Sequence, residues 1–127
     1  MATRGTIAVV HKNGTVSQVY AHWDNYLSGT GQTLMDHYNS QELAESLVTV
    51  GDISSVGNTV ETTEYYGRDR GEDEVEARVF ADLDGYYRGI QGQEYNYLFA
   101  NGEWLVEYDD SDGEYVSLQQ ALLEEAN

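Results

Sequence analysis

Two Asn-Gly pairs, each flanked by segments of alternating apolar and polar residues, predict two β-hairpins. Asn13-Gly14 joins residues 6–11 to residues 15–23, and both segments are rich in β-branched side chains. Asn101-Gly102 lies between two further alternating segments. Asn and Gly both tolerate the positive φ angles of a type I′ turn. We therefore expect an antiparallel strand pair around each Asn-Gly pair.

The register of the second hairpin follows if its loop has two residues. Position 99 then pairs with 104, position 97 with 106, and position 95 with 108. Because side chains alternate along a strand, one face carries all six residues: Tyr95, Tyr97, Phe99, Trp104, Val106 and Tyr108. The opposite face mixes apolar with polar side chains. We expect the aromatic face to pack against helices.

Helical spacing appears between the hairpins and at the end of the chain. Residues 29–38 form one short candidate helix. Asn39 with Glu42 has the spacing of a capping box, and Gly51 stands where a left-handed C-cap would end that second helix. Ser117 with Gln120 repeats the box before a short C-terminal helix.

The segment between residues 51 and 92 has weaker signals. We predict strands within 59–66 and 76–80, a charged loop at 67–74, and a turn-rich stretch at 82–92. The whole pattern predicts a single α+β domain over residues 1–127. Its antiparallel sheet would be built from the two hairpins, with two or three short helices on one face.

Composition supports a folded chain. Hydrophobic residues make up 40% of the 127 and aromatics 12%, eleven of them Tyr, whereas disordered acidic segments are poor in aromatics. No apolar run approaches the roughly 20 residues of a membrane span, and no signal segment follows Met1. Cysteine is absent, which removes disulfides and thiolate metal sites and agrees with a cytosolic location.

Charge changes the picture most. The chain has 23 Asp and Glu against 6 Lys and Arg, for a net charge of −17. Residues 61–127 hold eighteen of the acids and four of the arginines. This charge disfavours direct binding to nucleic acid or an anionic membrane and favours a basic protein as partner. Two other interpretations stay open: acidity that serves solubility alone, and adaptation to high salt.

The acids form no convincing cation site. The motifs around Asp82 and Asp110 resemble the middle of a calcium loop but lack its first and last ligands. His22, Asp24, Asp36 and His37 are ligand types for zinc or iron, yet their spacing matches no known run. We predict no metal or cofactor, and keep a cation-binding module or metal-dependent enzyme using His22, Asp24 and His37 as an alternative.

No catalytic motif accompanies these residues. There is no cysteine nucleophile, no G-x-S-x-G elbow and no phosphate-binding loop. We therefore predict that the chain is not an enzyme.

The segment 65–72 combines tyrosines, arginines and glycines. Tyr and Arg are enriched among binding hot spots, so the segment is a candidate contact loop. Alternatively, it is a surface loop whose arginines pair with nearby acids. With the acidic clusters that follow it, the candidate protein-binding residues are Tyr65, Tyr66, Arg68, Arg70, Glu72, Asp73, Glu74, Glu76, Asp109, Asp110, Asp112 and Glu114. A homo-oligomer is an open alternative, because an aromatic sheet face wider than its helical cover must be buried elsewhere.

Strings along most of the chain resemble a family of small acidic proteins encoded by tailed bacteriophages and prophages. They are Met1-Ala2-Thr3-Arg4, Ile7, Asn13-Gly14-Thr15, Tyr20, His22-Trp23-Asp24, Leu34, His37-Tyr38, Gly51-Asp52-Ile53-Ser54, Tyr66-Gly67-Arg68-Asp69-Arg70-Gly71-Glu72 and Glu94-Tyr95-Asn96-Tyr97-Leu98-Phe99. The family usually has Gly after the Trp-Asp pair, where this chain has Asn25; Asn also visits left-handed conformations, so the turn can be kept.

The resemblance implies a viral origin and the host cytoplasm as location, and it implies no reaction. Small acidic phage proteins include many that bind and disable host proteins. Some imitate DNA to occupy defence or transcription machinery. By this analogy of class, we expect an accessory protein that binds a basic host protein, with DNA mimicry or defence inhibition as specific forms. A structural or housekeeping phage protein is the alternative.

Overall fold

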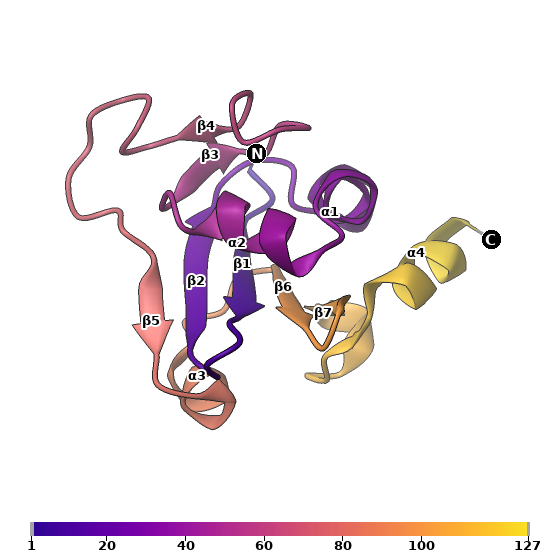
Figure 1. The fold of residues 1–127 in the computed structure, drawn as a ribbon. Helices are drawn as coiled ribbons and strands as arrows, with labels where there is room; N and C mark the ends of the chain where they lie inside the picture. The colour runs from indigo at the N-terminus through magenta and orange to yellow at the C-terminus, as the bar shows by residue number, and fades with distance from the viewer. Residues whose placement is uncertain (1, 127) are drawn as a thin grey trace.

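The computed structural model describes residues 2–126, which form a mixed β-sheet with short helices on both faces (Figure 1). The strands are β1 (Gly5–Val10), β2 (Val16–Ala21), β3 (Ile53–Ser55), β4 (Glu64–Tyr65), β5 (Arg78–Phe80), β6 (Tyr95–Ala100), β7 (Glu103–Glu107) and β8 (Val116–Ser117). The helices are the π-helical turn η1 (Leu27–Gly31), α1 (Gln32–His37), α2 (Gln41–Val48), α3 (Leu83–Gly89), the 3₁₀ turn η2 (Asp109–Ser111) and α4 (Leu118–Ala126). The α+β class is confirmed.

The sheet is larger than two hairpins, and it is not purely antiparallel. Its strand order is β4-β3-β2-β1-β6-β7-β8, with β5 also paired to β2. The two predicted hairpins, β1–β2 and β6–β7, meet in the centre because β1 and β6 run parallel. Short strands from the weakly patterned segments extend both edges, and β3 joins β2 in parallel. The prediction of an antiparallel sheet was therefore wrong at these two pairings, which depend on long connections that local patterns do not specify.

The aromatic face of the second hairpin forms the main core, as predicted. Phe99 pairs with Trp104 and Tyr97 with Val106, while the rings of residues 95 and 108 stack at 5.7 Å. The Trp104 indole N–H donates to the Tyr38 carbonyl oxygen at 3.1 Å. Buried side chains of α1, α2 and α4 cover this face, and Figure 1 shows α2 in front of the central strands.

The two hairpins turn in different ways. Asn101 (φ 53°) and Gly102 (φ 82°) both have positive φ, as the type I′ prediction requires. The type I′ turn predicted at Asn13-Gly14 was wrong, because Gly14 (φ 91°) has a positive φ and Asn13 does not. The His11 N–H donates to the Thr15 carbonyl oxygen at 2.8 Å, which leaves a three-residue loop. The Asn13 carboxamide oxygen accepts from both the N–H and the hydroxyl of Thr15, which stabilises the longer loop.

The second helix begins one residue later than its predicted cap. Ser40 is the N-cap, since its hydroxyl oxygen accepts the Leu43 N–H at 3.2 Å, so the capping box at Asn39 was wrong. Gly51 has φ 129°, and a Cβ there would lie 2.6 Å from the Val75 carbonyl oxygen, so the position requires glycine. The cap predicted at Ser117 is confirmed by its bond from the Gln120 N–H.

The stretch expected to be turn-rich contains α3, which covers the face opposite the other helices. Asp82 caps it, with Oδ1 accepting the Gly85 N–H at 2.7 Å. Tyr86 is fully buried in a second, smaller core with residues of β1, β2 and β6. Three helices, α1, α2 and α4, cover one face as predicted, and α3 is a further helix on the other face. The motif Asp82-x-Asp84-Gly85 is a capped helix start.

Asn25 does not take the left-handed conformation suggested for it. Its neighbour Asp24 does, with φ 60°. The Asn25 side chain is buried, and its Nδ2 donates to three carbonyl oxygens, those of Thr3, Ala21 and Trp23.

None of the helices within residues 2–126 has the length and apolar character that crossing a membrane requires.

Candidate functional site

All four arginines of residues 61–127 form ion pairs within the protein. Each of the four in residues 61–127 forms an ion pair with a carboxylate at 2.9 to 3.2 Å: Arg68 with Asp69, Arg70 with Glu64, Arg78 with Asp52, and Arg88 with Asp84. These cations therefore neutralise particular acids locally and leave the others unbalanced.

Arg68 holds the segment 60–69 together. Its guanidinium donates to the carbonyl oxygens of Val60 at 2.9 Å and Thr63 at 2.7 Å, and to the Asp69 carboxylate. It also lies 4.7 Å from the centroid of the Tyr65 ring. The hydrogen bond from Arg68, with one from the Tyr65 N–H, lowers the pKa of Asp69. This arginine has a structural role, as the surface-loop interpretation predicted.

Tyr65 belongs to the core. Its side chain is fully buried, and its hydroxyl donates to the Leu47 carbonyl oxygen at 2.6 Å. Burial raises its pKa well above the ordinary range for tyrosine. Tyr65 therefore cannot contact a partner of the folded protein. Tyr66 is half-buried beneath the guanidinium of Arg70, which in turn bonds Glu64 and the Ser54 hydroxyl.

The remaining candidate residues form two exposed clusters. The β5-side cluster (Glu72, Asp73, Glu74 and Glu76) lies in the connection from β4 to β5. The β8-side cluster (Asp109, Asp110, Asp112 and Glu114) lies between β7 and β8. Within residues 2–126, none of these eight acids forms an ion pair.

The two clusters lie toward opposite edges of the sheet. The strand order places β4 at one edge and β8 at the other, six strand spacings apart. At about 4.8 Å per spacing, those edges are roughly 29 Å apart. The sequence brings all eight acids into one half of the chain, but the fold divides them into two surfaces.

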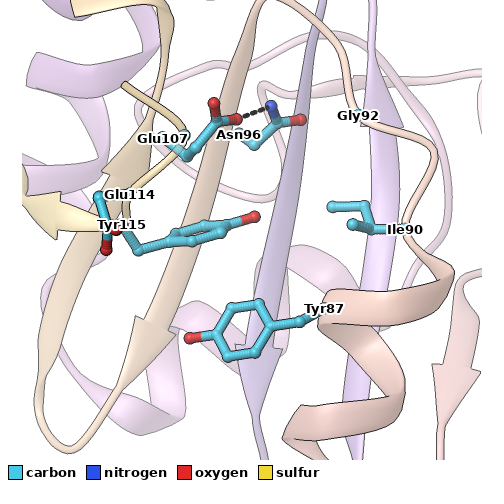
Figure 2. A pocket seen from close by; sticks show the side chains of 8 residues that line it. Tyr87, Ile90, Gly92, Asn96, Glu107, Glu114 and Tyr115 are labelled. Atoms are coloured by element: carbon cyan, nitrogen blue, oxygen red, sulfur yellow. Dashed lines mark hydrogen bonds between the residues drawn. The ribbon is translucent and has the colours of Figure 1, made fainter. Parts of the chain in front are cut away.

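A tyrosine-lined cleft of about 520 Å³ adjoins the β8-side cluster. It opens on the sheet face that α3 covers only in part, between the end of α3 and strands β6 and β7 (Figure 2). We call it the tyrosine cleft; its lining residues are Tyr87, Ile90, Gly92, Asn96, Glu107, Gly113, Glu114 and Tyr115. Two are acids and none is Lys, Arg or His, so the cleft has a net negative charge.

Two tyrosines line the aromatic side of this cleft, and a third packs against both of them. The rings of Tyr87 and Tyr115 meet at a centroid distance of 5.3 Å and an angle of 51°, and Tyr86 lies behind both. The hydroxyls of Tyr86 and Tyr115 are 3.0 Å apart. Burial raises the pKa of Tyr115 to about 12, so its hydroxyl is neutral at physiological pH. The side chain of Tyr87 is 45% exposed.

A hydrogen-bonded chain fixes the acidic side of the cleft. The Thr6 hydroxyl donates to Asn96 Oδ1 at 2.8 Å, and Asn96 Nδ2 donates to Glu107 Oε1 at 2.8 Å. Asn96 is only 2% exposed. One carboxylate oxygen of Glu107 is thus held by a buried amide, while no group of residues 2–126 forms a hydrogen bond with the other. Figure 2 shows the Tyr115 ring between Tyr87 and this Asn96–Glu107 pair.

A second cleft of about 390 Å³ lies on the same sheet face beside β5. Gln18 and Thr6 belong to its lining. Asp52 Oδ1 accepts the Tyr20 N–H at 2.8 Å and lies 3.2 Å from a nitrogen of Arg78. Since this pair neutralises itself, the second cleft has no comparable attraction for a cation.

The metal alternative gains no support from the geometry. Within residues 2–126, no three His, Asp or Glu side chains gather closely enough to hold an ion. His22 Nδ1 lies 2.6 Å from the Tyr20 hydroxyl, whereas Asp36 and His37 are exposed at the end of α1.

Local sequence patterns did not single out most residues of the tyrosine cleft, including Tyr87, Asn96, Glu107 and Tyr115. The mixed face of the second hairpin was a signal for Asn96 and Glu107, because polar residues opposite an aromatic face indicate a surface that is only partly covered. The Tyr86-Tyr87 pair was obscured by the glycines around it.

Comparison of the chain with protein-family models, with curated proteins and with solved structures gave no match.

Proposed function

We propose that the chain is an accessory protein that binds the basic surface of another protein. The observation that carries this proposal is the internal pairing of all four arginines in residues 61–127. The exposed clusters therefore keep their charge uncompensated. Such a surface attracts a positively charged partner and repels nucleic acid and anionic membranes.

The β8-side cluster is the better candidate for the centre of the interface. Its Glu114 also lines the tyrosine cleft, so the cluster is continuous with an aromatic surface. Exposed carboxylates alone contribute little affinity, because solvent screens them. Aromatic side chains in a partly buried pocket are typical binding hot spots. The β5-side cluster also has four acids, but none of them lines the tyrosine cleft or the second cleft.

The resemblance to proteins of tailed phages makes a host protein in the host cytoplasm the proposed partner. DNA mimicry is one form of this function, in which a partner would contact both clusters across roughly 29 Å of sheet. A partner with a compact basic patch would need the β8-side cluster alone. The arrangement favours the compact partner, because the two clusters lie toward opposite edges of the sheet and not beside each other.

The test is affinity capture of basic proteins from bacterial lysate with matched charge variants. One variant neutralises the β8-side cluster: Asp109→Asn, Asp110→Asn, Asp112→Asn and Glu114→Gln. A second neutralises the β5-side cluster in the same way. A control neutralises four exposed acids elsewhere: Asp36→Asn, Glu42→Gln, Glu61→Gln and Glu94→Gln.

We expect a specific basic protein to be captured by the wild type and by the control, and to be lost with the β8-side variant. Capture should weaken above about 0.1 M salt, where the screening length falls to about 10 Å. If the control variant loses capture of the basic protein as fully as the β8-side variant does, only the net charge of the protein matters for binding. Failure of the wild type to capture any basic protein at low salt would favour acidity that serves solubility.

A further inference from the structure

We infer that the tyrosine cleft binds the guanidinium group of an arginine side chain. This inference rests on the proposed function and specifies its chemistry: the basic partner would insert one arginine between the Tyr115 ring and Glu107. The argument uses the shape of the cleft, its charge, and the way its groups are held.

The cleft selects for a cation. Glu107 and Glu114 line it, and within residues 2–126 its lining includes no Lys, Arg or His. The nearest basic residue on α3, Arg88, is 75% exposed at its side chain and paired with Asp84 at 3.0 Å. A net charge of −17 adds a further attraction for positive ligands.

The aromatic rings favour a cation with an apolar, planar surface. Tyr87 and Tyr115 present ring surface at one side of the cleft, and Ile90 adds an apolar side chain. Cations are attracted to ring faces by the aromatic quadrupole, and a neutral tyrosine keeps that attraction. The hydrocarbon stem of an arginine side chain would also cover the apolar side chain of Ile90.

The position of Glu107 distinguishes guanidinium from ammonium. A guanidinium can lie flat on a ring while its edge N–H groups donate to a carboxylate, whereas an ammonium is a compact point charge that cannot do both as well. Tyr115 and Glu107 both line the cleft, and Figure 2 draws the Tyr115 ring below the Glu107 carboxylate. Because Asn96 holds one oxygen of Glu107, the carboxylate is oriented before the ligand arrives.

The experiment uses three small probes that share one neutral backbone: the N-acetyl methylamides of arginine, lysine and citrulline. Citrulline keeps the planar shape of arginine without its charge. Each probe is titrated into the whole protein, and NMR follows the Asn96 side-chain amide and the ring signals of Tyr87 and Tyr115. We expect the arginine probe to shift these signals, the lysine probe to bind more weakly, and the citrulline probe to bind at least about tenfold more weakly.

Two variants locate the site. Glu107→Gln keeps an acceptor for Asn96 but removes the charge, and we expect at least about fivefold weaker binding of the arginine probe. Tyr87→Ala removes a 45% exposed ring and should weaken binding roughly 2- to 30-fold. Glu103→Gln is the matched control, because Glu103 is an exposed acid at the other end of β7, outside the cleft. It should leave binding of the probe unchanged.

Three results would overturn the inference. They are equal binding of the lysine or citrulline probe, equal loss of binding with Glu103→Gln and Glu107→Gln, or NMR shifts confined to the Asp109–Asp112 loop.

Different results contradict the arginine site and the proposed function. Probe binding without capture of a basic protein contradicts only the proposed function. Capture that survives Glu107→Gln and Tyr87→Ala, with no probe binding, contradicts only the arginine site.

Discussion

Tyr65 and Tyr66 show how far two neighbouring side chains of the same type can differ. Tyr65 points into the core and donates to the Leu47 carbonyl oxygen near the end of α2. Tyr66 points outward and lies under the Arg70 guanidinium. Tyr65 is the last residue of β4 and lies on the buried face of that strand, whereas Tyr66 begins the turn that follows β4. The two tyrosines therefore have different roles because of their positions in the fold, one in a strand and the other in a turn.

We expect Tyr65→Phe to reduce the free energy of unfolding by about 1 to 3 kcal/mol, because a buried carbonyl oxygen loses its donor. Tyr66→Phe is the control and should change it by less than about 0.5 kcal/mol. Urea denaturation followed by circular dichroism measures both. Similar values for the two variants would contradict the structural role assigned to the Tyr65 hydroxyl.

At the scale of elements, α3 creates the candidate site. It covers only part of its sheet face, so Tyr86 is buried while the next residue, Tyr87, is 45% exposed at the cleft. The helix is short, with seven residues, and isolated helices of that length are not stable in water. Its stability depends on the Asp82 cap and on the burial of Tyr86.

We therefore expect Asp82→Ala to destabilise the protein by about 0.5 to 2 kcal/mol, the usual cost of removing an N-cap. Asp82→Asn keeps a capping oxygen and should cost less than about 0.5 kcal/mol. Thermal denaturation in the presence of a chelator measures both, and added calcium should not change the order. A stabilisation by calcium that Asp82→Ala abolished would instead revive the calcium-loop interpretation.

At the scale of the whole molecule, buried tyrosines make stability depend on alkaline pH. Burial raises the pKa of Tyr65, Tyr86 and Tyr97 well above the ordinary value, and that of Tyr115 to about 12. In the unfolded chain these hydroxyls ionise near pH 10. The folded state then holds protons that the unfolded state has lost. The stabilisation is complete below about pH 10 and falls as the pH rises above it.

Titration with alkali should accordingly show two phases of tyrosinate absorbance. The first phase should be reversible and leave the fold intact, and the buried tyrosines should ionise only as the circular dichroism of the fold is lost. The variant Tyr115→Phe should reduce the amplitude of the second phase. A single phase near pH 10 with the fold intact would contradict the burial of these side chains.

Local patterns in the sequence were sufficient for the second hairpin. Asn101-Gly102 set the turn, and the alternation around it set which residues share a face, because both depend only on neighbours along the chain. The same kind of reasoning identified the Ser117 cap. It failed at Asn13-Gly14, where a side-chain bond to Thr15 stabilises a longer loop, and at α3, where burial of Tyr86 outweighs the glycines around it.

The sequence by itself determined the charge, the folded α+β character and the aromatic core face, since composition and periodicity are properties of the chain alone. Only the tertiary structure decided which strands meet, that the arginines are paired internally, and that the acids divide between two edges. It also brought Tyr87, Asn96, Glu107 and Tyr115 into one cleft. These contacts join positions far apart in the chain, and a parallel pairing such as β1 with β6 leaves no local signal.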